Sequence, residues 1–180
     1  MNIFIAGARA ITSLDKQVRA RLSSICEKGY NVLVGDADGV DSSVQRFYAD
    51  LGYGNVTVFA GNGRARNNIG HWTVENVVVD EPLKGFDFYK QKDQAMADKA
   101  DYGFMIWNGE SKGTLNNIIN LIKQDKDVLV YFAPQGALIK IDELEKLNRL
   151  VTLCPGSVQR VYGKLLKEAG AYNQQQLVLF

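Results

Sequence analysis

Two glycine-rich turns carry the residue types best suited to chemistry in this sequence. One covers residues 35–39, and the other ends in Gly113 and Thr114. Each is expected to follow a strand and precede a helix, where glycines leave backbone N–H groups open to a ligand and the helix N-terminus attracts an anion. The two turns therefore predict a site for a nucleotide-type phosphate ligand.

The first of these turns contributes Gly35, Asp38 and Gly39 to the predicted phosphate site. Its acids also suit another role, because Asp38 or Asp41 can cap the following helix without any ligand. The Asp-Ala-Asp-Gly spelling further suggests a calcium loop. That interpretation fails, because a third early acid is absent and Phe47 stands where such a loop needs glutamate.

The second turn offers backbone N–H groups and the Thr114 hydroxyl at the start of an expected helix, which suits a phosphate. A plain helix cap without a ligand remains the alternative. The turn is not a P-loop, because Gly109 is followed too soon by Gly113 and no Lys-Ser/Thr pair ends it. An ATPase signature is therefore absent from this turn.

Two further loops add arginines to the predicted site. Gly7 and Arg9 follow the first expected strand, and Arg64 and Arg66 lie among glycine and asparagine after the third. A guanidinium group binds phosphate through a fork of donors, so Arg9 and Arg66 are candidate ligand-binding residues. Solvated arginines in exposed loops are the alternative. His71 has no partner that would make it a metal ligand or a base.

The elements that must position these loops alternate between short β-rich runs and helical patterns. Strands are expected at residues 2–6, 31–34, 55–59, 102–107, 128–132 and 138–141, with helices at 14–28, 40–51, 88–99, 114–124, 142–150 and 156–169. Strands joined by helices run parallel, so we predict a Rossmann-like α/β fold, a doubly wound and mostly parallel sheet with helices on both faces. Ligands of such sheets bind at the carboxyl ends of the strands, where the four loops are expected to converge.

Length and composition favour one domain over residues 1–170, with a core at about 2–132, a C-terminal helical extension at 137–169 and a tail at 171–180.

The net charge of +1 provides no phosphate-tracking basic groove, so direct nucleic-acid binding is not expected. The apolar runs are too short to cross a bilayer and no signal peptide is recognised, so we expect a cytoplasmic protein without membrane contact. The two cysteines match no metal-ligand spacing, and no metal or required cofactor is expected.

Three stretches resemble the SLOG superfamily of Rossmann-like nucleotide binders: FIAGARAITSLD, VLVGDADGVDSSV and KDQAMADKADYGFMIWNGESKGTLNNI. The likeness spans roughly residues 2–132 and is greatest to the small, stand-alone YpsA-type members of bacteria and phages. LOG phosphoribohydrolases and the DNA-processing protein DprA are related to them. The resemblance implies that a nucleotide site is lined by Gly7, Arg9, Gly35, Asp38, Gly39, Gly113 and Thr114, and faced by Lys92 and Asp93.

The resemblance to LOG enzymes also raises the question of catalysis. Their fourth loop reads PGGxGTxxE, and its glutamate serves cleavage of an N-glycosidic bond, but Asn117 stands at that position here. An amide neither acts as a base nor stabilises an oxocarbenium-like centre by charge. We therefore expect a nucleotide-binding sensor or accessory module. A nucleoside 5′-phosphate N-glycosidase is the alternative, with Asp41, Asp93 and Glu110 as candidate catalytic acids.

The last five residues resemble the QLxLF peptides that dock on the DNA sliding clamp. Gln176 would bond at the rim of an apolar pocket that Leu177, Leu179 and Phe180 fill. A DNA-metabolism accessory protein that docks on the clamp is thus a further alternative, and an apolar tail packed on the domain is the other interpretation. Homo-oligomerisation, common in the superfamily, is an open alternative, and the apolar run at residues 73–79 is a candidate interface.

Overall fold

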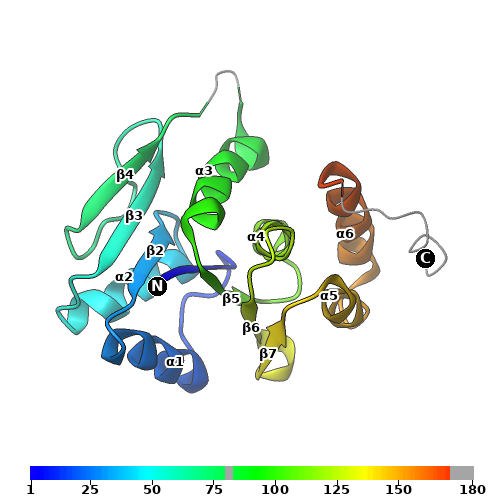
Figure 1. The fold of residues 1–180 in the computed structure, drawn as a ribbon, viewed down its shortest axis with the longest axis horizontal. Helices are drawn as coiled ribbons and strands as arrows, with labels where there is room; N and C mark the ends of the chain where they lie inside the picture. The colour runs from blue at the N-terminus through cyan, green and yellow to red at the C-terminus, as the bar shows by residue number, and fades with distance from the viewer. Residues whose placement is uncertain (80–82, 171–180) are drawn as a thin grey trace.

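The computed structural model describes residues 1–79 and 83–170, whose centre is a seven-stranded sheet (Figure 1). The strands lie in the order β4-β3-β2-β1-β5-β6-β7. In chain order their bounds are Asn2–Gly7 (β1), Asn31–Gly35 (β2), Val56–Gly61 (β3), Thr73–Val77 (β4), Tyr102–Trp107 (β5), Val128–Phe132 (β6) and Ala137–Ile141 (β7). Every neighbouring pair is parallel except β6 and β7. The predicted Rossmann-like, mostly parallel sheet is confirmed.

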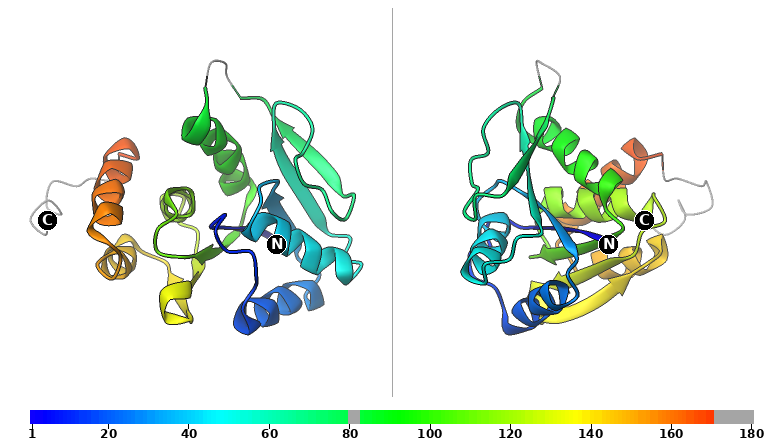
Figure 2. Two further views of the ribbon diagram at one scale, coloured as in Figure 1. Left: turned by 180° about the vertical axis from the view of Figure 1, so that it is seen from behind. Right: turned by 60° about the vertical axis from the view of Figure 1, so that its left-hand side comes forward.

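Helices cover both faces of this sheet, as the alternation of patterns predicted. One face carries α1 and α2, the other carries α3 and α4, and α5 and α6 pack beyond α4 and β7 (Figures 1 and 2). The helix bounds are Lys16–Glu27 (α1), Val40–Asp50 (α2), Gly85–Lys99 (α3), Lys112–Ile122 (α4), Leu144–Val151 (α5) and Gly156–Glu168 (α6). The sheet thereby divides the interior into two hydrophobic cores.

Strand β1 shows why the sequence folds in this way. Its successive side chains point to opposite faces, so Ile3 and Ile5 enter the core with α1 and α2, while Phe4 and Ala6 enter the core with α3 and α4. All four are buried. A central strand of a parallel sheet is covered on both faces and is therefore apolar throughout, which made this run recognisable in the sequence.

Local chemistry fixes the ends of helix α1. The carboxylate of Asp15 accepts a hydrogen bond from the backbone N–H of Gln17 at 2.8 Å and caps the first turn. Gly29, with φ of 65°, adopts the left-handed conformation that follows many helix C-termini. The helix therefore ends where the glycine in the sequence indicated.

The run at residues 73–79 forms part of the sheet, which the sequence did not indicate. Its first five residues are strand β4, an edge strand that pairs in parallel with β3. The loop 62–72 makes the connection without a helix. Within it, Asn68 Nδ2 donates to the carbonyl of Trp72, and Trp72 Nε1 donates to the carbonyl of Tyr53, which precedes β3. The proposal of an interface at this run stays a prediction.

The reversal at β7 follows from the short connection before it. A turn of 3-10 helix, Ala133–Gln135, leads to Gly136, which has φ of 58°. So short a connection cannot cross back over the sheet, and β7 therefore runs antiparallel to β6. Helices α5 and α6 follow β7, so the predicted C-terminal extension begins with the strand expected at residues 138–141, which belongs to the main sheet.

Within residues 1–79 and 83–170, no helix is both long and apolar enough to cross a lipid bilayer. The predicted clamp-docking residues Gln176, Leu177, Leu179 and Phe180 lie outside the described part of the chain.

Candidate functional site

A cavity of about 530 Å³ opens at the carboxyl ends of β1 and β5. The strand order reverses between these two strands, because β2, β3 and β4 extend the sheet to one side and β6 and β7 to the other. Open parallel sheets bind ligands at such a position, and the volume suits a small molecule. The walls come from the loops after β1, β2 and β5, from Arg66, from one side of α3, and from the N-terminal parts of α2 and α4.

The structure brings most of the candidate site residues together around this cavity. The predicted residues that line it are Gly7, Arg9, Asp41, Arg66, Lys92, Asp93, Glu110, Gly113 and Thr114. Gly35, Asp38 and Gly39 are not among its lining residues. The glycines of the turn after β2 therefore lie behind the cavity wall, to which the same turn contributes Ala37.

Close packing explains the glycines of this turn without a ligand. A Cβ atom on Gly35 would lie 2.3 Å from Asp41 Oδ2 and 2.8 Å from Lys92 Nζ. Gly39 has φ of 78°, and a Cβ there would lie 2.3 Å from the backbone oxygen of Arg9. These contacts leave no room for a side chain, so the glycines bring the acidic turn against Lys92 and against the loop after β1.

A buried ion-pair network joins β2 to α3 beneath the cavity. Asp36 is 4% exposed and accepts hydrogen bonds from Arg66 Nη2 at 2.8 Å and from Lys92 Nζ at 3.1 Å. Burial alone would raise the pKa of Asp36, but the hydrogen bonds from Arg66 and the charge of Lys92 outweigh it and hold the pKa far below its ordinary value. Asp36 is therefore an anion that anchors both cations.

Two other carboxyl groups face the same lysine, and their pKa values are raised rather than lowered. Burial raises the pKa of Asp41 to about 7, although the charge of Lys92 opposes this. Burial also raises the pKa of Asp93, whose Oδ1 lies 4.0 Å from Lys92 Nζ and which Asn117 supports with a hydrogen bond. A carboxyl group that titrates near neutrality can donate or accept a proton during a reaction. Asp41 thus has chemistry available that Asp36 lacks, and the pKa of Asp93 is shifted in the same direction as that of Asp41.

The mouth of the cavity combines cations with aromatic rings. The guanidinium carbons of Arg9 and Arg66 lie 4.7 and 4.9 Å from the ring centroid of Tyr89, and Arg66 Nη1 donates to the Tyr89 hydroxyl at 3.2 Å. Phe86 lies in the same wall, with Lys112 Nζ 3.9 Å from its ring centroid. The sequence analysis did not identify Phe86 or Tyr89 as site residues. A helical pattern does not distinguish an aromatic residue that contacts a ligand from one that packs in a core.

The N-terminus of α4 has a protein cap of its own. Ser111 Oγ accepts hydrogen bonds from the backbone N–H of Thr114 at 3.3 Å and from the Thr114 hydroxyl at 3.0 Å. Thr114 is only 2% exposed. The cap that we considered as the alternative is therefore present, and Gly113 is the part of this turn at which backbone lines the cavity.

Solved structures with a similar fold include one of a protein that processes DNA. The chain has a fold like that of DNA processing protein A. The similar structure, from Helicobacter pylori, covers 93% of this chain and 81% of its own, with a TM-score of 0.57 and 13% sequence identity. It was determined to describe a single-stranded DNA-binding mode. No family model and no curated protein matches the chain, and at 13% identity the likeness to the solved structure shows the fold alone.

The sequence led us to exclude direct binding to nucleic acid, and this comparison contradicts that exclusion. The similar structure is that of a protein that binds single-stranded DNA. Net charge was a poor reason for that exclusion. The value of +1 averages over the whole sequence, whereas Arg9, Arg66 and Lys90 gather around one cavity. Nucleic acids respond to local charge of this kind.

No cluster of three or more histidine, cysteine, aspartate or glutamate residues that would suit a metal ion occurs in residues 1–79 and 83–170. His71 is exposed, has φ of 53° and is not a lining residue of the cavity. Its place in the fold supports neither a metal nor a catalytic role.

Proposed function

We propose that the cavity at the carboxyl ends of β1 and β5 binds a nucleotide unit, and that the protein acts as a nucleotide-binding module of the YpsA type. The observation that carries the proposal is the group of Arg9, Arg66 and Tyr89 at the mouth of a cavity with a buried polar floor. Cations bind the phosphate of a nucleotide, and an aromatic ring offers a surface to its base.

The phosphate is assigned to the cationic side of the mouth. Arg9 is exposed and its guanidinium group lies over the Tyr89 ring, so its donors are open to an anion, whereas Arg66 donates to Asp36. Gly113 brings the N-terminal backbone of the eleven-residue helix α4 to the same cavity. Helix N-termini and guanidinium groups both favour a phosphate.

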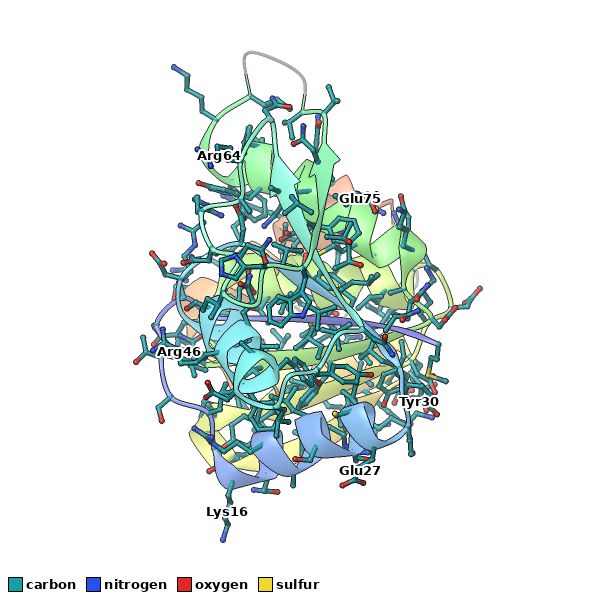
Figure 3. All side chains as sticks on the ribbon, turned by 90° about the vertical axis from the view of Figure 1, so that its left-hand side faces the viewer. Lys16, Glu27, Tyr30, Arg46, Arg64 and Glu75 are labelled. Carbon is teal, nitrogen blue, oxygen red and sulfur yellow. The ribbon has the colours of Figure 1, made fainter. Side chains whose placement is uncertain are left out.

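This proposal predicts a large effect of Arg9 on affinity. Arg9→Ala should weaken binding of nucleoside monophosphates about tenfold or more, because a charge-assisted contact with the phosphate is lost. Titration calorimetry with the purified protein measures the effect. Arg64→Ala is the matched control, since Arg64 lies exposed on the outside of the loop after β3 and does not line the cavity (Figure 3). Equal affinities for the Arg9 variant and the wild type would overturn the proposal.

The nucleotide unit has two sources, free nucleotide or a single strand of nucleic acid. The fold shared with DNA processing protein A is the observation in favour of the strand. Fluorescence anisotropy with short labelled oligonucleotides tests this source directly. If a strand occupies the cavity, free nucleotide should compete with it and Arg9→Ala should weaken it. If the strand binds without competition, the cavity is a site for free nucleotide only.

Cleavage of the bound nucleotide is a second candidate function, favoured by Asp41 and Asp93. Their pKa values are raised by burial, and both residues line the cavity. A protonated carboxyl group assists departure of a base from a sugar. Chromatography after incubation with nucleoside monophosphates should detect free base if the protein is an N-glycosidase, and no release from any of them would leave binding alone.

A further inference from the structure

The floor of the cavity holds a buried acceptor that the protein does not use. Asn117 lies on α4, is 3% exposed and lines the cavity. Among the described residues, its Oδ1 has no hydrogen-bond partner. A buried amide oxygen left without a donor is costly, and folded proteins rarely retain one without a reason. The cavity is the direction from which a donor can arrive.

A carboxylate lies beside this amide. Asn117 supports Asp93 with a side-chain hydrogen bond, which uses one of the two N–H donors of its amide and leaves the amide oxygen without a partner. Lys92 is nearby, but its shortest ion pair is with Asp36 at 3.1 Å, whereas Asp93 is 4.0 Å away. Asp93 and Asn117 therefore both present acceptor oxygens to the cavity.

Acceptors at the floor and cations at the mouth require a ligand with two different ends. The mouth suits a phosphate, as argued above, whereas a phosphate dianion has no hydrogen to donate to the acceptor oxygens of the floor. Hydroxyl groups are neutral donors and suit the floor. Gly113 and Asn117 are four residues apart on α4, which corresponds to about 6 Å along the helix axis. That span fits one sugar ring and is shorter than the distance from a 5′-phosphate to the far edge of a base.

We infer that the floor recognises the ribose of a ribonucleotide unit, with Asn117 Oδ1 and the Asp93 carboxyl group accepting hydrogen bonds from the 2′- and 3′-hydroxyls. The inference rests on the proposed function and specifies its sugar. A free ribonucleotide and an RNA strand share this chemistry, and a deoxyribose unit lacks one of the two donors.

Calorimetry with the four ribonucleoside 5′-monophosphates and their 2′-deoxy counterparts tests the inference. The ribonucleotide should bind about tenfold tighter or more, because removal of the hydroxyl leaves buried acceptors unpaired. Binding of both sugars with equal affinity overturns the inference and leaves the proposed function standing. Failure of all of these nucleotides to bind overturns the proposed function itself. Oligouridylate against oligodeoxyuridylate applies the same comparison to a strand.

Two asparagines on one helix provide a matched pair of variants. Asn117→Leu removes the acceptor at the floor, and the preference for ribose should fall to about one. Asn120 is 8% exposed, has an unpartnered Nδ2 among the described residues, and is not a lining residue, so Asn120→Leu should keep the full preference. An Asn117→Leu protein that still prefers ribose overturns the inference. Asp93→Asn supplies the same test if the leucine variant does not fold, because it should also reduce the preference.

Discussion

Replacing Lys92 by methionine is expected to lower the free energy of unfolding by about 3–5 kcal/mol. Lys92 is 3% exposed and lies among three carboxyl groups, Asp36, Asp41 and Asp93. Methionine approximates the length of the lysine stem but removes the charge, so buried acids lose the cation that compensates them. Breaking one side of a buried ion-pair network is far more costly than the intact network is stabilising.

The measurement is urea denaturation followed by tryptophan fluorescence, with Lys90→Met as the control. Lys90 lies on the same helix, and its ion pair with Glu168 at 3.1 Å involves side chains that are 33% and 54% exposed. Such a surface pair contributes up to about 1 kcal/mol. If the two methionine variants lost the same small amount of stability, the buried network would not have the role described above.

The order and type of most elements could be predicted from the sequence, because a parallel sheet imposes simple patterns. Strand β6 is buried at all five positions, and its apolar sequence reveals this directly. Helix α1 repeats apolar residues at Val18, Leu22 and Ile25, the spacing of one helix face. These patterns depend on local burial, which a sequence records.

Strand β4 shows where such patterns fail. It has no fully buried residue, since it lies at the sheet edge, and its pairing with β3 depends on backbone hydrogen bonds that any sequence can make. No helix lies between β3 and β4, so the usual sequence signal of a parallel crossover connection is absent. The run at residues 73–79 is rich in apolar residues, but its sequence has no periodic pattern from which a strand could be predicted.

The candidate site was predictable at the level of loops and only in part at the level of residues. The topology rule brought Gly7, Arg9 and Gly113 to one cavity. Tyr89 and the free oxygen of Asn117 depend on the angle at which α3 and α4 cross the strand ends, and no local pattern encodes that angle. The sequence favoured a phosphate site, whereas the structure adds the acceptors that specify the rest of the ligand.

The protein is expected to lose stability as the pH rises from about 4 to about 7. The pKa of Asp41 is raised from an ordinary value of 3.8 to about 7, so between these values the folded state holds a proton that the unfolded chain releases. Stability therefore falls with rising pH, fully present below the unfolded pKa and lost through the folded one. The pKa of Asp93 shifts in the same direction, whereas Asp36, with its lowered pKa, is ionised in both states over all but the acidic end of this window. The total loss should be roughly 2–4 kcal/mol.

Asp41→Asn should flatten this dependence, because the amide has the shape of the acid but does not titrate. Its Oδ1 can still accept the hydrogen bond that Asp41 takes from the backbone N–H of Ala37 at 3.2 Å. Urea denaturation at pH 5 and pH 8 compares the two proteins. The control is Asp38→Asn, an exposed acid of the same turn that accepts a hydrogen bond from Asn67 Nδ2, and it should keep the wild-type slope. If the Asp41 variant also kept that slope, the proton would reside elsewhere, and the raised pKa that makes Asp41 a candidate proton donor would be wrong.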